Sequence, residues 1–438
     1  MCYTIFGRAT VVAIAGLGLL IPFSQAETVH HILSTGQSLS LGCLGTPPYD
    51  AEPYGKNITL TALSPPARIL PIIPATALAY CDAGGSEYPL LAAANQLTYA
   101  TGGPNMGWTI AVTPHGVSGA PYSALCGPSC PGGPTGPFTL GQTQIRLIKN
   151  NLSPGQTYSL EGVYVTHGET DDQNSVSAAA YEGYLAQWQA DYETLAETAP
   201  NRTRTLPVSI EHERFRPSIL PMFIDQEAAW GHYHGVGTAP NTALGQYMAM
   251  ENYPDKIYLV SPKYFLPTAD SVHLTGASYL WLGEIAAKAM KTVLVDKHRW
   301  TPLTPRRVSR TGSVVVIDFF VPVGSLQFDT TTVEKVPNYG FEFFDSNSSA
   351  SIAGVYITSP DSVTLTLSGV PTGIQRVRYA YTALQGRPSG AGNLKDTDPT
   401  PSRTGNNLSD WAVTFDVPID FESNLETAAR RTPRLKPR

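Results

Sequence analysis

Residues 28–39 of the chain read TVHHILSTGQSL, an apolar run that passes into a polar turn. The segment from Val29 to Leu33 is short and apolar, and it predicts a buried β-strand. Gly36 lets the chain turn sharply after this strand, and we expect a helix to start near Ser38. A strand, a glycine turn and a helix in this order are typical of a parallel α/β sheet.

Strand-like and helix-like segments alternate from this point to about residue 295. The expected strands lie at 108–113, 160–166, 206–210 and 257–260. The expected helices lie at 86–99, 140–150, 178–198 and 275–293. This alternation predicts a parallel sheet with helices on both faces, and we assign it to a first domain over residues 27–300.

The pattern changes after Trp300. Pro302 and Pro305 are typical of a linker, and the segments beyond them are short strands separated by turn signals. These strands are expected at 314–321, 340–344, 353–358, 363–367, 377–381 and 411–415. Because no long helix interrupts them, residues 301–438 are predicted to form an accessory β-sandwich domain that ends in a basic tail.

The N-terminus has the features of a secretory signal peptide. Arg8 precedes the apolar run from Val11 to Phe23, and the small residues up to Ala26 fit a cleavage site. We therefore expect residues 1–26 to be removed and the mature protein to be secreted, periplasmic or extracellular, with no membrane association. An uncleaved anchor is the alternative, although the apolar run is shorter than the roughly 20 residues that span a bilayer.

Four cysteines remain outside this segment, and an even count in an exported chain favours two disulfides. Cys126 and Cys130 bracket a short turn rich in Gly and Pro and are expected to pair, which leaves Cys43 with Cys81. A zinc site is the alternative, but the cysteines lack paired C-x2-C spacing and have no histidine at ligand distance.

Composition limits the class of partner. The net charge is −6 and charged residues make up 15% of the chain, so nothing points to nucleic acid. Hydrophobic residues make up 42%, which is enough for a sizeable core and argues against a disordered chain.

Three polar side chains have the chemistry of a hydrolytic site. Ser38 follows the first strand, and open α/β sheets bind ligands at the carboxyl ends of their strands. Asp270 and His273 precede the last expected helix, and their D-x-x-H spacing allows one turn to bring the carboxylate beside the imidazole. Each signal alone also fits a helix-capping residue in an ordinary surface loop. Together, the order Ser, Asp, His on an α/β pattern favours nucleophilic hydrolysis.

Two further loops follow expected strands of the same sheet. Residues 116–120 read GVSGA, and their glycines would let a backbone N–H face a reacting carbonyl. Residues 166–171 read THGETD, and in a parallel sheet this polar loop is expected beside Ser38. His232 and His234 have the spacing of a metal pair but lack an evident third ligand, so we expect them in a loop that lines the cleft.

At these positions the chain resembles the SGNH-hydrolase superfamily and, within it, the sialic-acid-specific acetylesterase-like (SASA) carbohydrate esterases. That family carries a G-Q-S nucleophile block, a Gly-containing second block, a Q-G-E-[S/N]-D third block and a closing D-x-x-H. The matching positions, in this order within residues 28–294, are Gly36-Gln37-Ser38, Gly119, His167-Gly168-Glu169-Thr170-Asp171, and Asp270 with His273. The joint match is specific although each block alone is not, and the C-terminal β-domain lies outside it.

The resemblance implies a flavodoxin-like three-layer domain and a serine esterase that removes O-acetyl groups from a carbohydrate or polysaccharide without a metal or organic cofactor. Ser38 would be the nucleophile, His273 the base and Asp270 its orienting partner. The oxyanion would be held by the backbone N–H groups of Ser38 and Gly119 and by the side chain of His167. The histidine departs from the family, which places Gln or Asn there, but a neutral imidazole N–H can also donate.

The same resemblance makes Gln37 and Glu169 supporting residues, with Glu169 a structural partner that braces the nucleophile loop. Two alternative functions stay open. One is a lipid or small-ester hydrolase on the same scaffold, and the other is a carbohydrate-binding or adhesion protein whose esterase site has decayed.

Overall fold

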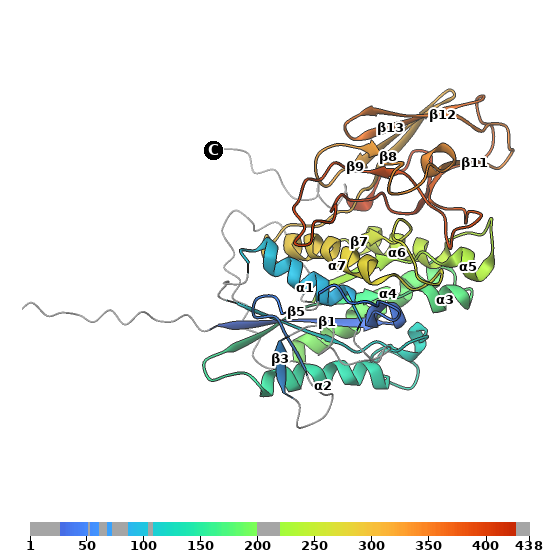
Figure 1. The fold of residues 1–438 in the computed structure, drawn as a ribbon. Helices are drawn as coiled ribbons and strands as arrows, with labels where there is room; N and C mark the ends of the chain where they lie inside the picture. The colour runs from blue at the N-terminus through green and yellow to red at the C-terminus, as the bar shows by residue number, and fades with distance from the viewer. Residues whose placement is uncertain are drawn as a thin grey trace, which may run out of the picture.

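The structure is a computed structural model that describes residues 27–50, 53–60, 68–71, 86–103, 108–198 and 220–425. Four expectations fall outside these residues: the signal peptide, Cys81, the strand at 206–210 and the basic tail. In the described residues, a seven-stranded sheet flanked by helices forms an N-terminal α/β part, and separate antiparallel sheets form a C-terminal β part (Figure 1).

The seven-stranded sheet has the order β3-β2-β4-β1-β5-β6-β7. Its strands are β1 (Thr28–Gly36), β2 (Ile58–Leu60), β3 (Ile69–Pro71), β4 (Thr109–Pro114), β5 (Thr157–Thr166), β6 (Met222–Gln226) and β7 (Ile257–Pro262). The strands from β4 to β7 in this order are parallel, whereas β3 runs antiparallel to β2 at the edge. Counted along the chain, the parallel strands have the 2-1-3-4-5 order of flavodoxin-like sheets, whose ligand site lies at the switch point beside the first strand.

Alternating side chains of the buried strands face two apolar cores. Ile32 of β1 packs in the core that includes residues of α1 (Pro89–Ala100) and α7 (Gly276–Met290). Leu33 belongs to the core on the opposite face, which is covered by α2 (Gly136–Asn150), α4 (Ala178–Thr198) and α6 (Asn241–Asn252). Figure 1 shows α1 and α7 above the strands and α2 below them. Three layers therefore follow from the two-residue period of the strands.

The predicted helices agree in place with α1, α2, α4 and α7. The expected helix near Ser38 differs, because it is a four-residue 3-10 helix, Ser38–Leu41, that ends at a glycine. The sequence pattern also did not mark β2, β3 or β6, nor α6 and the short helices α3 (Glu169–Gln173) and α5 (Trp230–His234). These elements are too short or too weakly periodic to stand out from their neighbours.

The C-terminal part contains a four-stranded sheet in the order β12-β13-β9-β8, a three-stranded sheet β11-β14-β16, and the pair β10-β15. The strands are β8 (Thr304–Thr311), β9 (Val314–Phe320), β10 (Gln327–Phe328), β11 (Phe341–Asp345), β12 (Ile352–Ser359), β13 (Ser362–Leu367), β14 (Gln375–Tyr379), β15 (Leu394–Lys395) and β16 (Phe415–Pro418). The two larger sheets meet through Phe319, whose ring lies 6.4 Å from that of Phe341 and 6.3 Å from that of Phe415.

Two details of the β part differ from the prediction. Strand β8 begins at Thr304, inside the expected linker, because it pairs along its length with β9. The strand expected at 411–415 starts only at Phe415, and Trp411 makes a single β-bridge with Lys395.

Buried polar contacts fix the β part against the α/β part. At the end of β6, the Gln226 side chain donates to Thr414 O at 2.9 Å and accepts from the Thr414 N–H at 2.8 Å. On α7, Lys288 pairs with Asp398 at 2.7 Å and with Asp410 at 2.8 Å. The β part is therefore held near the carboxyl end of β6, on the side of the sheet where parallel sheets bind ligands.

Candidate active site

The nucleophile loop begins where β1 ends. Gly36 has a φ of 133°, and a Cβ at this position would lie 2.0 Å from the carbonyl oxygen of Thr166 at the end of β5. Only glycine fits this approach and this backbone conformation. The Gln37 N–H then donates to Thr166 O at 3.3 Å, and Ser38 occupies the first position of the 3-10 helix with 5% exposure. Ser38 thus lies at the switch point between β1 and β5.

Three of the predicted side chains meet at this point. Ser38 Oγ lies 2.8 Å from His273 Nε2, and His273 Nδ1 lies 2.8 Å from Asp270 Oδ2. Because an ionised carboxylate only accepts, the imidazole proton is on Nδ1, and Nε2 presents its lone pair to the serine hydroxyl. Ser38 and His273 are 235 residues apart in the chain, so the sheet topology is what brings them together.

The Asp270 carboxylate is held by its own turn. Its Oδ1 accepts the backbone N–H groups of Val272 at 3.1 Å and of His273 at 2.7 Å. Ser271 within this turn has a φ of 74°, a left-handed conformation that is rare for non-glycine residues and recurs at functional sites. Partial burial opposes ionisation, but the hydrogen bonds from His273 and the backbone outweigh it and lower the pKa of Asp270. Asp270 is therefore ionised at neutral pH.

The second loop, residues 115–120, is tied to the nucleophile loop. The Val117 N–H donates to Gly36 O at 2.9 Å. Gly119 is exposed and has a φ of 69°. Within the described ranges, neither the Ser38 N–H nor the Gly119 N–H has an acceptor in the protein. These two backbone N–H groups lie on adjoining loops and can donate to a ligand.

His167, in the third loop, is fully buried. Its Nδ1 lies 2.8 Å from the Tyr181 hydroxyl and its Nε2 lies 3.1 Å from Ala120 O. Burial lowers the pKa of His167, so the ring is neutral, and its one proton lies on Nε2 because a carbonyl oxygen only accepts. This corrects the expectation that the His167 side chain donates to the oxyanion. Its N–H instead holds Ala120, the neighbour of Gly119.

The rest of the third loop adds two ties. The Thr170 N–H donates to Gln37 Oε1 at 3.2 Å, and Asp171 Oδ2 accepts the Tyr122 N–H at 2.8 Å. Gln37 therefore links the nucleophile loop to the third loop. The expected bracing by Glu169 is corrected, because in the described residues its carboxylate pairs with a lysine outside the nucleophile loop.

That lysine is Lys263, which centres a buried ion cluster that the sequence analysis missed. Its Nζ lies 2.7 Å from both Glu169 Oε1 and Asp225 Oδ1, and Thr166 Oγ1 donates to Asp225 Oδ2 at 2.7 Å. Burial alone would lower the pKa of Lys263, but the two carboxylates outweigh it and raise it. The available signal was a charged residue near the end of each of two strands, Asp225 within β6 and Lys263 directly after β7.

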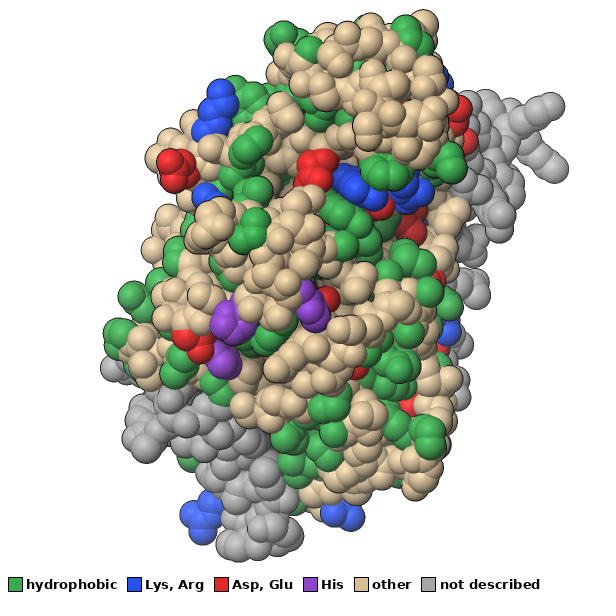
Figure 2. Space-filling view, turned by 90° about the vertical axis from the view of Figure 1, so that its right-hand side faces the viewer, with side chains coloured by type: hydrophobic (Ala, Val, Ile, Leu, Met, Phe, Trp, Pro, Cys, Tyr) green, Lys and Arg blue, Asp and Glu red, His purple; other side chains and the backbone are tan. Residues whose placement is uncertain are grey.

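His232 and His234 lie in the short helix α5 and not in a loop. His234 Nε2 is 2.7 Å from Asp172 O and 3.1 Å from Asp172 Oδ2. Within the described ranges, no group of three or more His, Cys, Asp or Glu side chains is placed to hold a metal ion. Figure 2 shows histidine side chains gathered in the middle of one face, below a hollow that contains basic, acidic and hydrophobic side chains.

Cys126 and Cys130 form a disulfide, as predicted, which excludes this pair as zinc ligands. Cys43 is also disulfide-bonded, and its expected partner at position 81 lies outside the described residues. No helix among the described residues combines the length and the apolar character that crossing a bilayer requires.

Comparison with known proteins identifies the fold. No protein-family model and no curated protein matches the chain. XAC1771, a carbohydrate acetylesterase from Xanthomonas citri, is 15% identical, with 88% of this chain and 80% of that chain covered and a TM-score of 0.58. A protein from Arabidopsis thaliana is 14% identical over 60% of this chain and 98% of that chain, with a TM-score of 0.43. A two-domain esterase (CEX) active on acetylated mannans is 10% identical over 91% and 93% of the two chains, with a TM-score of 0.29. Of these three, XAC1771 alone scores above 0.5, and at this identity the likeness is one of fold.

Proposed function

We propose that this protein is a secreted serine esterase of the SGNH type that removes O-acetyl groups from a carbohydrate or polysaccharide. One observation carries the proposal. Ser38 Oγ, the His273 ring and the Asp270 carboxylate form a chain of hydrogen bonds, each 2.8 Å long, at the switch point of a parallel sheet. A serine beside an imidazole whose tautomer is set by a carboxylate is the arrangement that nucleophilic acyl transfer requires.

In the first half of the proposed reaction, His273 Nε2 takes the Ser38 proton while Oγ attacks the carbonyl carbon of the acetyl ester. The backbone N–H groups of Ser38 and Gly119 donate to the oxyanion that forms. His273 then gives the proton to the departing sugar oxygen, the ester C–O bond breaks, and acetyl-Ser38 remains. Losing one oxyanion donor in such a site costs about 2.7–4 kcal/mol of barrier.

In the second half, a water molecule loses a proton to His273 and attacks the acetyl-serine. The intermediate collapses to acetic acid while the Ser38 oxygen takes the proton from His273, and the acid then releases its own proton to water as acetate. Asp270 orients the ring in both halves and stabilises its cation. With one proton released to water, the proposed cycle balances through these side chains and uses no metal or organic cofactor.

The substrate class and the location rest on separate support. XAC1771, which shares the fold, is described as a carbohydrate acetylesterase, and this motivates acetylated carbohydrate as the substrate. The disulfide between Cys126 and Cys130 favours an oxidising compartment, because cytosolic thiols are kept reduced.

The test measures acetate release from acetylated xylan and acetylated mannan, and hydrolysis of p-nitrophenyl acetate and p-nitrophenyl palmitate. We expect acetate release that falls by about 10³-fold or more in Ser38→Ala. The matched control is Ser153→Ala, an exposed serine in the turn before β5, which should keep the wild-type rate. Activity on the palmitate ester alone would favour a lipid esterase, and no release from any ester would overturn the proposal.

A further inference from the structure

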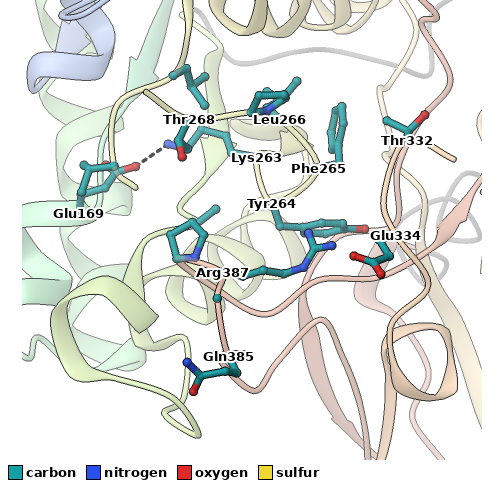
Figure 3. Close-up of a pocket in the computed structure, with 16 residues that line it drawn as sticks. Glu169, Lys263, Tyr264, Phe265, Leu266, Thr268, Thr332, Glu334, Gln385 and Arg387 are labelled. Atoms are coloured by element: carbon teal, nitrogen blue, oxygen red, sulfur yellow. Dashed lines mark hydrogen bonds and ion pairs between the residues drawn. The ribbon is translucent and has the colours of Figure 1, made fainter. Parts of the chain in front are cut away.

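A cavity of about 390 Å³ lies between the α/β part and the β part of the chain. Its lining includes Val272 and Leu274 on one side and Thr332, Glu334, Gln385 and Arg387 on the other. Figure 3 shows Lys263 and Thr268 from the α/β part and Glu334 and Arg387 from the β part around the cavity. Cavities of this size are typical of small-ligand sites and occur preferentially at such boundaries.

The cavity shares a wall with the active-site segment. Val272 and Leu274 flank His273, and neighbouring Cα atoms are about 3.8 Å apart. This segment is a tight loop closed at its base: Thr268 and Leu274 form an antiparallel β-bridge, and His273 O accepts the Ala269 N–H at 2.7 Å. A ligand in the cavity would therefore touch both neighbours of the residue that faces Ser38.

The wall from the β part is held in place before any ligand arrives. The N–H groups of Gly231 and His232 in α5 both donate to Pro388 O, at 2.8 and 3.1 Å. The Gly237 N–H donates to Ala383 O at 2.9 Å. Because the loop that carries Gln385 and Arg387 is pinned between these bonds, little ordering free energy is lost when a ligand binds.

The polar groups of the cavity suit a ligand rich in hydroxyls. Glu334 and Gln385 are exposed, and Arg387 is half-buried. Deeper in the cavity Glu169 is 1% exposed, and its Oε1 pairs with Lys263 as Figure 3 shows. Within the described residues its Oε2 is buried and has no hydrogen-bond partner. Because this oxygen is closed off from the cavity, the polar groups open to a ligand are the side chains of Glu334, Gln385 and Arg387.

We propose that this cavity binds a neutral sugar unit of the substrate, beside the unit whose acetyl group is attacked; this inference rests on the proposed function. Carboxylate, amide and guanidinium groups pair with sugar hydroxyls, which both donate and accept. The lining carries two cationic side chains, Lys263 and Arg387, and two carboxylates, Glu169 and Glu334, so it has no net charge and favours an uncharged sugar over a uronic or sialic acid. The β part thereby contributes directly to substrate choice.

The test compares Arg387→Ala and Gln385→Ala with the wild type. Kinetics on an acetylated manno-oligosaccharide and on p-nitrophenyl acetate are measured together, and calorimetry follows binding of the deacetylated oligosaccharide to each protein. Each variant should raise KM and Kd for the oligosaccharide about 3- to 10-fold, the usual effect of one lost hydrogen bond. The change on p-nitrophenyl acetate, which has no sugar, should be at least threefold smaller.

Lys335→Ala is the control, because Lys335 is exposed beside Glu334 but lies over the Tyr339 ring, 4.7 Å from its centroid, and outside the cavity lining. It should leave both constants unchanged. Equal effects of Arg387→Ala on both substrates, unchanged oligosaccharide binding, or tighter binding of an oligogalacturonate would overturn the proposal. If the wild type released no acetate, the proposed function would fail, and the binding titration alone would still decide the role of the cavity.

Discussion

The substitution Gly36→Ala separates the position of Ser38 from its chemistry, because it touches none of the side chains that react. The added Cβ would lie 2.0 Å from Thr166 O and 2.8 Å from the same carbonyl carbon. These are backbone atoms of β5 and cannot rotate away. Relief therefore requires the end of β1 to move by roughly 1 Å, and the φ of 133° adds a backbone cost of about 1–3 kcal/mol.

A displacement of about 1 Å carries Ser38 Oγ from its 2.8 Å contact with His273 Nε2 to beyond hydrogen-bond range. Misplacement of this size costs on the order of 100-fold in rate. We therefore expect kcat/KM on p-nitrophenyl acetate to fall about 100-fold and the free energy of unfolding in urea to fall by about 2–4 kcal/mol.

Gly155→Ala is the matched control. Gly155 has a φ of 88°, and nothing lies within 4 Å of the position of its Cβ, so this variant has the backbone strain without the close contact. It should lose about 1 kcal/mol of stability and keep the wild-type rate. A Gly36→Ala variant with kcat/KM within threefold of the wild type would show that the close approach of β1 and β5 does not position Ser38.

Three further predictions concern charged groups. Lys263→Met leaves two buried carboxylates without a counter-charge and should lower the free energy of unfolding in urea by about 3–5 kcal/mol. Burial raises the pKa of Glu251 to about 7, above its ordinary value of 4.5, so the folded protein holds this proton more tightly and loses stability as the pH rises through this range. As the pH is raised from about 5 to about 7, the Tm of Glu251→Gln should therefore increase relative to the Tm of the wild type. Asp270→Asn should lower kcat on p-nitrophenyl acetate by about 10²- to 10⁴-fold, because the amide favours the wrong tautomer of His273.

Each of these has an outcome that would contradict it. Lys256→Met removes a partly exposed pair with Glu193, 2.8 Å apart, and should cost under about 1 kcal/mol. An equally small loss in Lys263→Met would show that burial does not strengthen the Lys263 cluster. A Tm difference between Glu251→Gln and the wild type that stays constant with pH would rule out the raised pKa of Glu251. If Asp270→Asn kept the wild-type kcat, the Asp270 carboxylate would have no role in the mechanism.

Local patterns were sufficient for the long elements and for singling out Ser38, Asp270 and His273, which the structure brings together. The helices α1, α2, α4 and α7 and the strands β1, β4, β5 and β7 carry enough apolar residues at regular spacing to be predicted. Ser38 stood out because it follows a strand and a glycine, and Asp270 because it lies three positions before His273, in a D-x-x-H spacing. The strand β6 was missed, as its short apolar run does not differ in period from a loop segment or a buried helix turn.

The roles of His167, Glu169 and Lys263 depended on the tertiary structure. A sequence shows that a side chain has a proton to donate or a charge to pair, but its partner is set by which strand ends become neighbours in the sheet. Here the order β4-β1-β5-β6-β7 places Ala120 against His167, and Lys263 between Glu169 and Asp225. Because of this strand order, the His167 N–H is bonded to Ala120 O, and the Glu169 carboxylate is paired with Lys263.

The chain by itself determined the order of the long strands and helices and singled out the hydroxyl, imidazole and carboxylate of the candidate site, because these depend on spacings of a few residues. The 2.8 Å contact between Ser38 and His273, the shared wall of the cavity and the docking of the β part were decided only on folding. They join segments far apart in the chain, such as Ser38 and His273, which are 235 residues apart. Such contacts form only when the whole core packs, since their entropy cost is met by burial of both apolar faces of the sheet.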